Sequence, residues 1–170
     1  ERLNRFSASA VQTLYDNPYA YYMRYILRLE PLDAVARPLD NSDKGSLYHK
    51  ILEEFLSMPH PQQTEAVLTE LAATHMAAFD TSASLMWLPR FGQFARYFLA
   101  EQQQRHAAGH QVASLETRRE TQLGQHTLYA EPDRVDKASN GHIIIDYKTG
   151  TIPANKDLTS FNALQLWVGA

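Results

Sequence analysis

The feature that most constrains the fold is the pair Asn140-Gly141, which lies between two runs of strand-forming residues. Asn-Gly in this setting is the strongest short-range signal for a β-hairpin. A two-residue turn at this pair places Asp133 opposite Lys148, whereas a four-residue loop over 138–141 places Asp133 opposite Asp146. In both registers Asp133, Asp146 and Lys148 share one face of the hairpin, and only an odd-length loop or a bulge would separate them.

Two carboxylates and a lysine on one face suit a divalent metal ion. Mg²⁺ takes oxygen ligands and usually needs only one or two protein carboxylates beside waters and phosphate oxygens. A bound metal acts as a Lewis acid and lowers the pKa of a water molecule, and Lys148 is placed to orient that water or to stabilise developing charge. The alternative is that Asp133, Asp136 and Lys148 are solvated charges on an ordinary antiparallel pair.

Four motifs follow one another in a fixed order along the chain. They are the opening run 6–32, the Gly-x-x-x-His segment 45–49, the pair of segments 133–136 (Asp-Arg-Val-Asp) and 144–150 (Ile-Ile-Asp-Tyr-Lys-Thr-Gly), and Gln165-Leu166. Together they resemble the RecB-type branch of the PD-(D/E)XK nuclease superfamily. The opening run resembles the start of the C-terminal nuclease domain of AddB-type subunits in bacterial double-strand-break repair helicase-nucleases.

This resemblance implies an α/β fold with a restriction-endonuclease-like core, in which a small mixed sheet is flanked by helices and preceded by a helical N-terminal part. It implies a single nuclease domain over residues 1–170, as a portion of a larger protein. Residues 1–110 are expected to be mainly helical, and residues 111–170 to hold the catalytic sheet and the start of the next helix.

The resemblance also implies an activity: metal-dependent hydrolysis of DNA phosphodiester bonds, of the exonuclease type, in double-strand-break repair and recombination. The implied cofactor is Mg²⁺, with Mn²⁺ able to substitute, and the implied partners are DNA and an AddA-type helicase-nuclease subunit. Two other readings stay open. One is a non-catalytic domain that keeps the fold for DNA threading or subunit contact, and the other is a stand-alone exonuclease of the same superfamily.

Site residues are carried over only where this sequence matches the family. The implied metal ligands are His49, Asp133, Asp146 and, through its backbone carbonyl, Tyr147. The implied catalytic residues are Asp133, Asp146, Lys148 and Gln165, of which Gln165 would help to fix the lysine or the substrate. Pro132 departs from the family, which usually has glycine or alanine before the first aspartate, because proline belongs at a strand end or a sheet edge.

The chain contains no cysteine. Many AddB-type nuclease domains hold an iron–sulfur cluster with four cysteines, and thiolates are the ligands of such clusters. Asn17-Pro18 stands where a Cys-Pro would open the domain. The resemblance is therefore to the subgroup without an iron–sulfur cluster.

The formal net charge is -3, which is not typical of a protein that holds DNA through bulk electrostatics. A carboxylate-rich site is acidic until a metal fills it, and neighbouring domains of a large helicase-nuclease can deliver the strand. No apolar run approaches the roughly 20 residues that span a bilayer. We therefore expect a soluble, cytoplasmic protein with no membrane partner.

The hydrophobic pattern predicts the remaining elements. We expect helices over 46–56, 62–78 and 91–107, with 87–90 connecting the last two, and strands over 115–123 and 126–129 around a turn at Gly124-Gln125. Near the N-terminus, Ser9 is a candidate helix cap and Pro18 marks a break or a new first turn. The set Tyr15, Tyr19, Tyr22 and Ile26 fits one helical stripe, for which core packing is favoured over base stacking.

Overall fold

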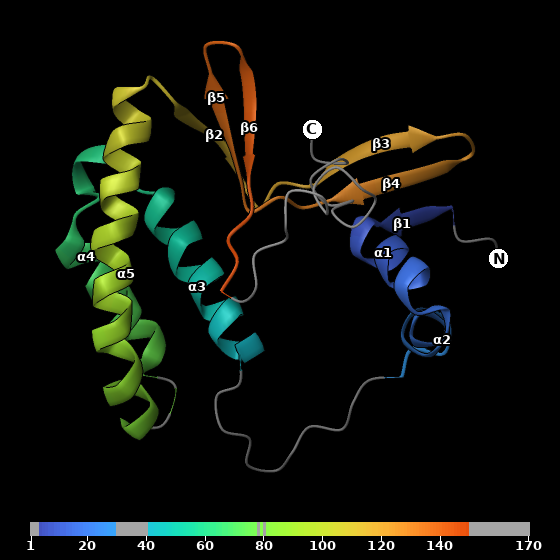
Figure 1. Cartoon of the computed structure of the whole chain (residues 1–170), viewed down its shortest axis with the longest axis horizontal. Coiled ribbons are helices and arrows are strands. Elements are labelled where there is room, and N and C mark those ends of the chain that lie inside the picture. The colour runs from blue at the N-terminus through green and yellow to red at the C-terminus, as the bar shows by residue number, and fades with distance from the viewer. Residues whose placement is uncertain (1–3, 30–40, 78, 80, 150–170) are drawn as a thin grey trace.

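The computed structural model describes residues 4–29, 41–77, 79 and 81–149 (Figure 1). Over these residues it contains five α-helices and two three-stranded sheets. Helices α3, α4 and α5 form one group beside the sheet β2-β5-β6, and helices α1 and α2 accompany the sheet β1-β4-β3. The predicted fold class, an α/β structure consistent with a restriction-endonuclease-like core, is confirmed.

The main hydrophobic core lies among three helices, α3 (Asn41–Leu56), α4 (Glu65–Met76) and α5 (Thr81–Ala107). A short 3-10 helix, η2 (His60–Gln62), precedes α4. Fully buried side chains from all three helices meet in this core, among them Ile51, Phe55, Leu68 and Phe91. Burying a side chain of this size contributes about 1.5–3 kcal/mol. The core therefore holds α3, which is the helix that carries His49, in a fixed position.

Helix α5 is longer than predicted, because it continues through Pro89 without a connecting segment. The expected connection at 87–90 is wrong. Proline inside a helix removes one hydrogen bond and costs about 3 kcal/mol. Here Trp87 and Phe91 lie on either side of it in the core, with ring centroids 4.7 Å apart. The burial of these two rings outweighs the local preference of proline to end a helix.

The predicted hairpin is present as β5 (Arg134–Ala138) and β6 (Gly141–Ile145), with β2 (Gln111–Leu115) on the other side of β5. Ala138 pairs with Gly141, so Ser139 and Asn140 form the turn. The register with Asn140-Gly141 as the turn is wrong, and the pairing is that of the four-residue-loop alternative. Gly141 has a φ of 137°, so the glycine supplies its conformational freedom at the first strand position after the turn.

The second sheet consists of β1 (Arg5–Ser7), β4 (His126–Ala130) and β3 (Arg119–Leu123). Strand β4 pairs in parallel with β1 and antiparallel with β3, so this sheet is mixed. The turn at Gly124-Gln125 is confirmed, because Leu123 pairs with His126. The single strand predicted over 115–123 is wrong, since the chain breaks between β2 and β3 and changes sheets there.

The N-terminal segment forms α1 (Ala8–Asp16), α2 (Pro18–Tyr21) and a π-helical turn, η1 (Tyr22–Ile26). The cap of α1 is Ser7 rather than Ser9, and its hydroxyl accepts a hydrogen bond from Ala10 N–H at 3.0 Å. The new first turn at Pro18 is confirmed, and the Asn17 side chain caps it. Ala8 packs against Ala130 of β4, which fixes the start of α1 to the sheet.

The predicted core stripe on these N-terminal helices is wrong. Tyr15 and Tyr19 are 72% and 71% exposed, and Tyr22 and Ile26 are also exposed. The buried aromatic residue of this segment is Tyr21. The stripe assumed one continuous helix, but the backbone of Asn17 leaves the helical region at φ -153° and separates α1 from α2.

Candidate metal centre

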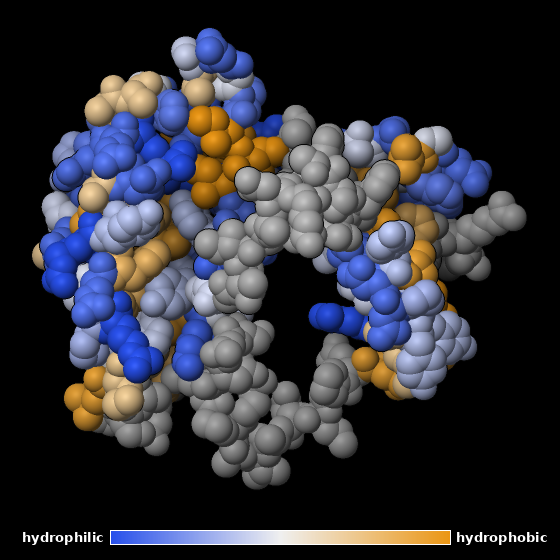
Figure 2. All heavy atoms as spheres, viewed as in Figure 1, coloured by the Kyte–Doolittle hydropathy of each residue, from blue (hydrophilic) through white to orange (hydrophobic). Residues whose placement is uncertain are grey.

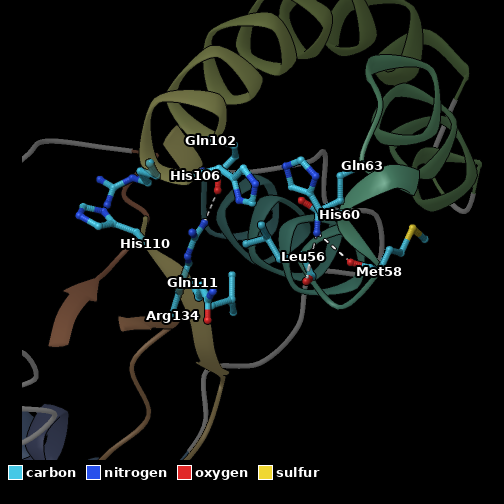
Figure 3. Close-up of a pocket in the computed structure, with 11 residues that line it drawn as sticks. Leu56, Met58, His60, Gln63, Gln102, His106, His110, Gln111 and Arg134 are labelled. Carbon is cyan, nitrogen blue, oxygen red and sulfur yellow. Dashed lines mark hydrogen bonds between the residues drawn. The ribbon is translucent and has the colours of Figure 1, made fainter. Parts of the chain in front are cut away.

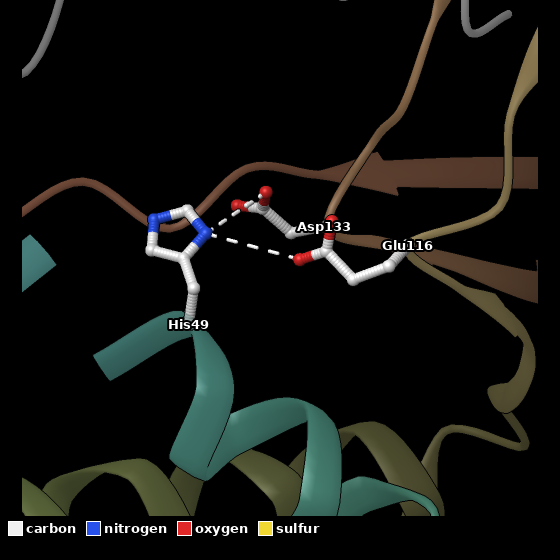
Figure 4. Close-up of side chains that lie close together, drawn as sticks. All are labelled: His49, Glu116 and Asp133. Carbon is white, nitrogen blue, oxygen red and sulfur yellow. Dashed lines mark ion pairs between the residues drawn. The ribbon is translucent and has the colours of Figure 1, made fainter. Parts of the chain in front are cut away.

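Three side chains from separate parts of the chain meet between α3 and the hairpin (Figure 4). His49 projects from α3, Asp133 lies just before β5, and Glu116 lies between β2 and β3. Each offers one ligand atom, and these atoms lie within 4.8 Å of one another. His49 Nδ1 is 3.1 Å from Asp133 Oδ1 and 3.9 Å from Glu116 Oε1. This cluster has the size of a metal site.

Asp133 is held by both neighbouring segments. Its Oδ2 accepts a hydrogen bond from Tyr147 N–H at 2.6 Å, and its backbone carbonyl accepts one from Glu116 N–H at 3.2 Å. Its side chain is only 7% exposed. Pro132 before it is fully buried but precedes the first paired residue, Arg134. The departure from the family pattern at Pro132 therefore removes no hydrogen bond from the ladder.

The acidic neighbours of His49 raise the pKa of its imidazole. The hydrogen bond to Asp133 raises the pKa of His49, and the charges of Asp133 and Glu116 raise it further, against the opposing effect of burial. A hydrogen bond to the backbone of Tyr147 raises the pKa of His49 as well. The Tyr147 backbone therefore lies beside the cluster.

Glu116 is the site residue that the sequence reasoning missed. It occupies a left-handed backbone conformation with φ 42°, which is rare for a non-glycine residue and costs of order 1–3 kcal/mol. Burial raises the pKa of Glu116, and the Asp133 charge raises it further. No motif marks this glutamate in the sequence. Its place in the cluster follows from the break between the two strands, which brings it beside Asp133.

Asp146 and Lys148 lie just beyond the end of β6. The ladder ends at the pair Arg134 and Ile145, so Asp133 and Asp146 are the next residues on the two strands. Asp146 Oδ2 accepts a hydrogen bond from Lys148 Nζ at 2.7 Å. Its other oxygen, Oδ1, is buried and has no hydrogen-bond partner among the residues that the structure describes. Within the described residues, Asp146 does not join the cluster of His49, Glu116 and Asp133.

The other half of the Asp-Arg-Val-Asp motif points away from this cluster. Asp136 is fully buried, and its carboxylate accepts hydrogen bonds from the Arg134 guanidinium, one of them at 2.9 Å. Arg134 also donates to Gln102 of α5. The alternative in which Asp133 and Asp136 are solvated charges is wrong. Lys148, by contrast, is 43% exposed. Gln165 lies outside the described residues.

A cavity of about 260 Å³ opens beside the cluster. Its lining includes Asp133 and Glu116, the residues 129–131 at the end of β4, and the residues 7–9 where α1 begins. The lining is mostly polar in character, and the cavity connects the carboxylates with solvent. A substrate that reached Asp133 through this cavity would pass the start of α1.

A second cavity, of about 240 Å³, lies on the other side of Arg134 (Figure 3). His60, His106 and His110 line it, and the rings of His60 and His106 stack with centroids 4.2 Å apart. In the described part of the chain these histidines do not form a group that could hold a metal ion. The candidate metal centre is therefore the cluster at Asp133.

The donors at this cluster fit a divalent metal. Carboxylate and carbonyl oxygens suit Mg²⁺ and Mn²⁺, and imidazole suits transition metals such as Mn²⁺ better than it suits Mg²⁺. The unpartnered Asp146 Oδ1 is a further oxygen whose hydrogen-bonding capacity is unused, and buried polar atoms normally have a partner.

An α/β core with a histidine and carboxylates gathered at the start of a hairpin defines a restriction-endonuclease-like domain with a candidate metal centre. The chain belongs to the PD-(D/E)XK nuclease superfamily, whose sequence model matches residues 5–168. No helix among the described residues is long and apolar enough to cross a membrane.

Three relatives come from the genus Rickettsia, and all three are uncharacterised proteins. The protein of Rickettsia bellii is 29% identical over 166 residues, which cover 91% of this chain. The proteins of Rickettsia conorii and Rickettsia felis are 28% and 27% identical, and each alignment covers 89% of this chain. The alignments cover 20%, 20% and 19% of these relatives, so the chain spans about a fifth of their length.

Proposed function

We propose that this chain is a metal-dependent DNA nuclease that hydrolyses phosphodiester bonds. The observation that carries the proposal is the cluster of His49, Glu116 and Asp133, whose ligand atoms lie within 4.8 Å of one another in a member of a nuclease superfamily. The buried, unpartnered Asp146 Oδ1 supports it, since this oxygen is available to a ligand.

The proposed metal is Mg²⁺, for which Mn²⁺ can substitute. The residues that would hold it are His49, Asp133, Asp146, the backbone carbonyl of Tyr147 and, in addition to the set implied by the family, Glu116. When bound, such an ion supplies Lewis-acid activation of a phosphate oxygen and of a water molecule. Asp146 would contribute Oδ1, the oxygen that Lys148 does not engage.

Lys148 is the proposed catalytic lysine. Its ammonium group is 43% exposed and lies 2.7 Å from Asp146 Oδ2, at the edge of the centre. From the edge of the centre it would orient the attacking water and stabilise the negative charge that develops on the phosphate oxygens. Gln165 is proposed to fix the lysine or the substrate.

We also propose a finer assignment to the RecB-like branch. In this assignment the chain is an AddB-type domain of the exonuclease type that has no iron–sulfur cluster. The opening run 6–32 and the absence of cysteine support it. The curated relatives are about five times longer than this chain, which leaves room for further domains. In this assignment the protein acts in the cytoplasm on double-strand breaks, together with an AddA-type partner.

The test is cleavage of end-labelled linear DNA, single- and double-stranded, by the 170-residue chain with Mg²⁺ or Mn²⁺. We expect cleavage that EDTA abolishes and that Asp146→Ala lowers by roughly a hundredfold or more, on the scale of losing one transition-state contact. Glu70→Ala, an exposed carboxylate on α4, is the matched control and should leave the rate unchanged.

Lys148→Ala separates catalysis from metal binding. It should abolish cleavage while leaving the affinity for Mn²⁺ within a few-fold of the wild-type value, because Lys148 is not a ligand. Undiminished cleavage by a folded Asp146→Ala variant would remove Asp146 from the site. If the wild-type chain cleaves neither substrate with either metal, the non-catalytic alternative replaces the proposal.

A further inference from the structure

Three exposed tyrosines lie on the N-terminal helices, and we refer to Tyr15, Tyr19 and Tyr22 as the tyrosine face. Their exposed fractions are 72%, 71% and 49%. Most large aromatic side chains in a folded domain are at least largely buried. Figure 2 shows weakly hydrophilic and hydrophobic side chains side by side over the region where Figure 1 places α2. Core packing in the described structure therefore does not account for these three side chains.

Two of the three tyrosines of the face are neighbours on one stretch of helix. Helix α2 runs directly into η1, so Tyr19 and Tyr22 are three residues apart and lie near each other on its surface. In the same stretch Tyr21 is buried, and its ring packs against that of Tyr25 with centroids 5.0 Å apart. Tyr21 therefore contributes to packing, whereas Tyr19 and Tyr22 are exposed to a ligand.

Two arginines lie on the same segment as the tyrosine face. Residues 15–29 contain two basic residues, Arg24 and Arg28, and one acidic residue, Asp16, although the whole chain has a net charge of -3. Both arginines are exposed, and the Arg24 guanidinium lies 5.8 Å from the centre of the Tyr25 ring. Aromatic rings for bases and arginines for phosphates are the combination by which proteins bind single-stranded nucleic acid without sequence preference.

The face is placed at a fixed distance from the candidate metal centre. The residues 7–9 at the start of α1 line the cavity that holds Asp133 and Glu116, and Tyr15 lies at the other end of the same helix. Nine residues of α-helix span roughly 14 Å. A strand bound at the face could therefore follow α1 and enter the cavity with only a few nucleotides between the two.

We propose that the tyrosine face binds single-stranded DNA and leads it along α1 to the metal centre. Bases stack on the exposed rings, and Arg24 and Arg28 contact the phosphates. Duplex DNA is excluded as the occupant, because its bases are already stacked on one another and cannot stack on tyrosine rings. The path to the centre rests on the proposed nuclease function, but the binding of the strand does not.

The test measures binding in the absence of catalysis. A fluorescein-labelled oligothymidylate of about 15 nucleotides, within the range that single-strand-binding domains cover, is titrated with the 170-residue chain in EDTA and followed by fluorescence anisotropy. Tyr19→Ala and Tyr22→Ala should each weaken binding by roughly 5- to 100-fold, the range expected for one base–aromatic stack. Tyr19→Phe should bind like the wild type, since stacking needs the ring and not the hydroxyl.

The matched control is Tyr97→Ala, because Tyr97 is 74% exposed on α5 and lies outside the face. Its affinity should stay within twofold of the wild-type value, and thermal unfolding should be unchanged in all of these variants. Wild-type affinity in both Tyr19→Ala and Tyr22→Ala, or equal binding of a duplex of the same length, would overturn the proposal. So would a change in self-association on sedimentation without a change in DNA binding, which would assign the face to a second copy of the chain.

Because the titration contains no metal, its result is independent of the cleavage assay. A chain that cleaves DNA but binds the oligonucleotide equally well with and without the tyrosines keeps the proposed function and loses this inference. A chain that binds through the tyrosines but does not cleave loses the proposed function and keeps this inference.

Discussion

The second aspartate of the Asp-Arg-Val-Asp motif is expected to matter for folding rather than for metal binding. Asp136 has 0% exposed side chain and Arg134 has 3%. Two hydrogen bonds join the guanidinium to the carboxylate, and Arg105 lies 3.7 Å from the same carboxylate. Asp136→Ala would leave a buried guanidinium whose remaining described partners are Gln102 and the Tyr147 hydroxyl.

Removing one partner of a buried ion pair typically destabilises a protein by about 3–5 kcal/mol. For a chain of this length, 1 kcal/mol corresponds to roughly 2–4 °C in the melting temperature. We therefore expect Asp136→Ala to lower the melting temperature by roughly 6–20 °C. Calorimetry of the metal-free chain, with urea unfolding as a second measurement of the free energy, provides the test.

A matched control comes from the surface. Glu120 pairs with Arg5, and the two side chains are 40% and 59% exposed. Exposed pairs contribute about 0–1 kcal/mol, so Glu120→Ala should change the free energy of unfolding by no more than that. A loss below about 1 kcal/mol in Asp136→Ala, equal to that of the control, would refute the reasoning, because the pair would then behave like a surface pair.

The double variant Arg134→Met/Asp136→Leu distinguishes an unpaired charge from a packing defect. Replacing both members of a buried pair by apolar residues of similar volume is often neutral or stabilising. The double variant should therefore be more stable than Asp136→Ala. If it is less stable than the single variant, the loss comes from packing and from the bonds to Gln102 and Tyr147, and not from an uncompensated charge.

Two further predictions concern the metal centre. Glu116→Gln should weaken Mn²⁺ binding by roughly 10- to 100-fold in a calorimetric titration, with Glu70→Gln as the control, and an unchanged affinity would remove Glu116 from the ligand set. The pKa of His49 is raised by its hydrogen bond to Asp133, and a metal must displace the proton. Mn²⁺ affinity should thus fall as the pH drops through that raised pKa, and His49→Asn should flatten this dependence; a wild-type affinity that is constant from pH 6 to 8 would contradict it.

The raised pKa of His49 also determines how the stability of the metal-free protein changes with pH. A His49 pKa that is higher in the folded state than the ordinary value of 6.5 stabilises the fold fully below that value, and this contribution is lost as the pH rises through the folded pKa. Metal binding favours the deprotonated imidazole and so acts in the opposite direction. Added Mn²⁺ should therefore raise the melting temperature more at high pH than at low pH.

Local patterns predicted much of the hairpin and little of its surroundings. Asn140-Gly141 located the β-hairpin, and strand alternation predicted Asp133, Asp146 and Lys148 on one face in either register. The ladder ends at Arg134 and Ile145, so Asp133 and Asp146 lie just beyond it, and in the described part of the chain Asp146 lies outside the cluster. The choice between the registers was not available locally. It depends on whether Gly141 lies in the turn or begins the strand, and both positions tolerate its φ of 137°.

The break at Glu116 shows why part of the site could not be predicted. The residues from Leu115 to Leu123 were predicted as one strand, and no glycine or proline interrupts them. The structure bends there because β2 pairs with β5 whereas β3 pairs with β4. These are contacts with residues far along the chain, and a glutamate strained by them has no signature in its neighbours. Pro89 was misjudged for a related reason, since distant core packing overrode its local preference.

Strand geometry explains how one short motif serves two purposes. Side chains two residues apart in a strand point to the same face, and adjacent ones point to opposite faces. Arg134 and Asp136 therefore face α5 together, where they neutralise each other in a buried setting. Asp133, one residue earlier, turns toward His49 on α3. The buried pair anchors the start of β5 to α5, and this anchoring holds the neighbouring carboxylate against His49 without any contribution from the metal itself.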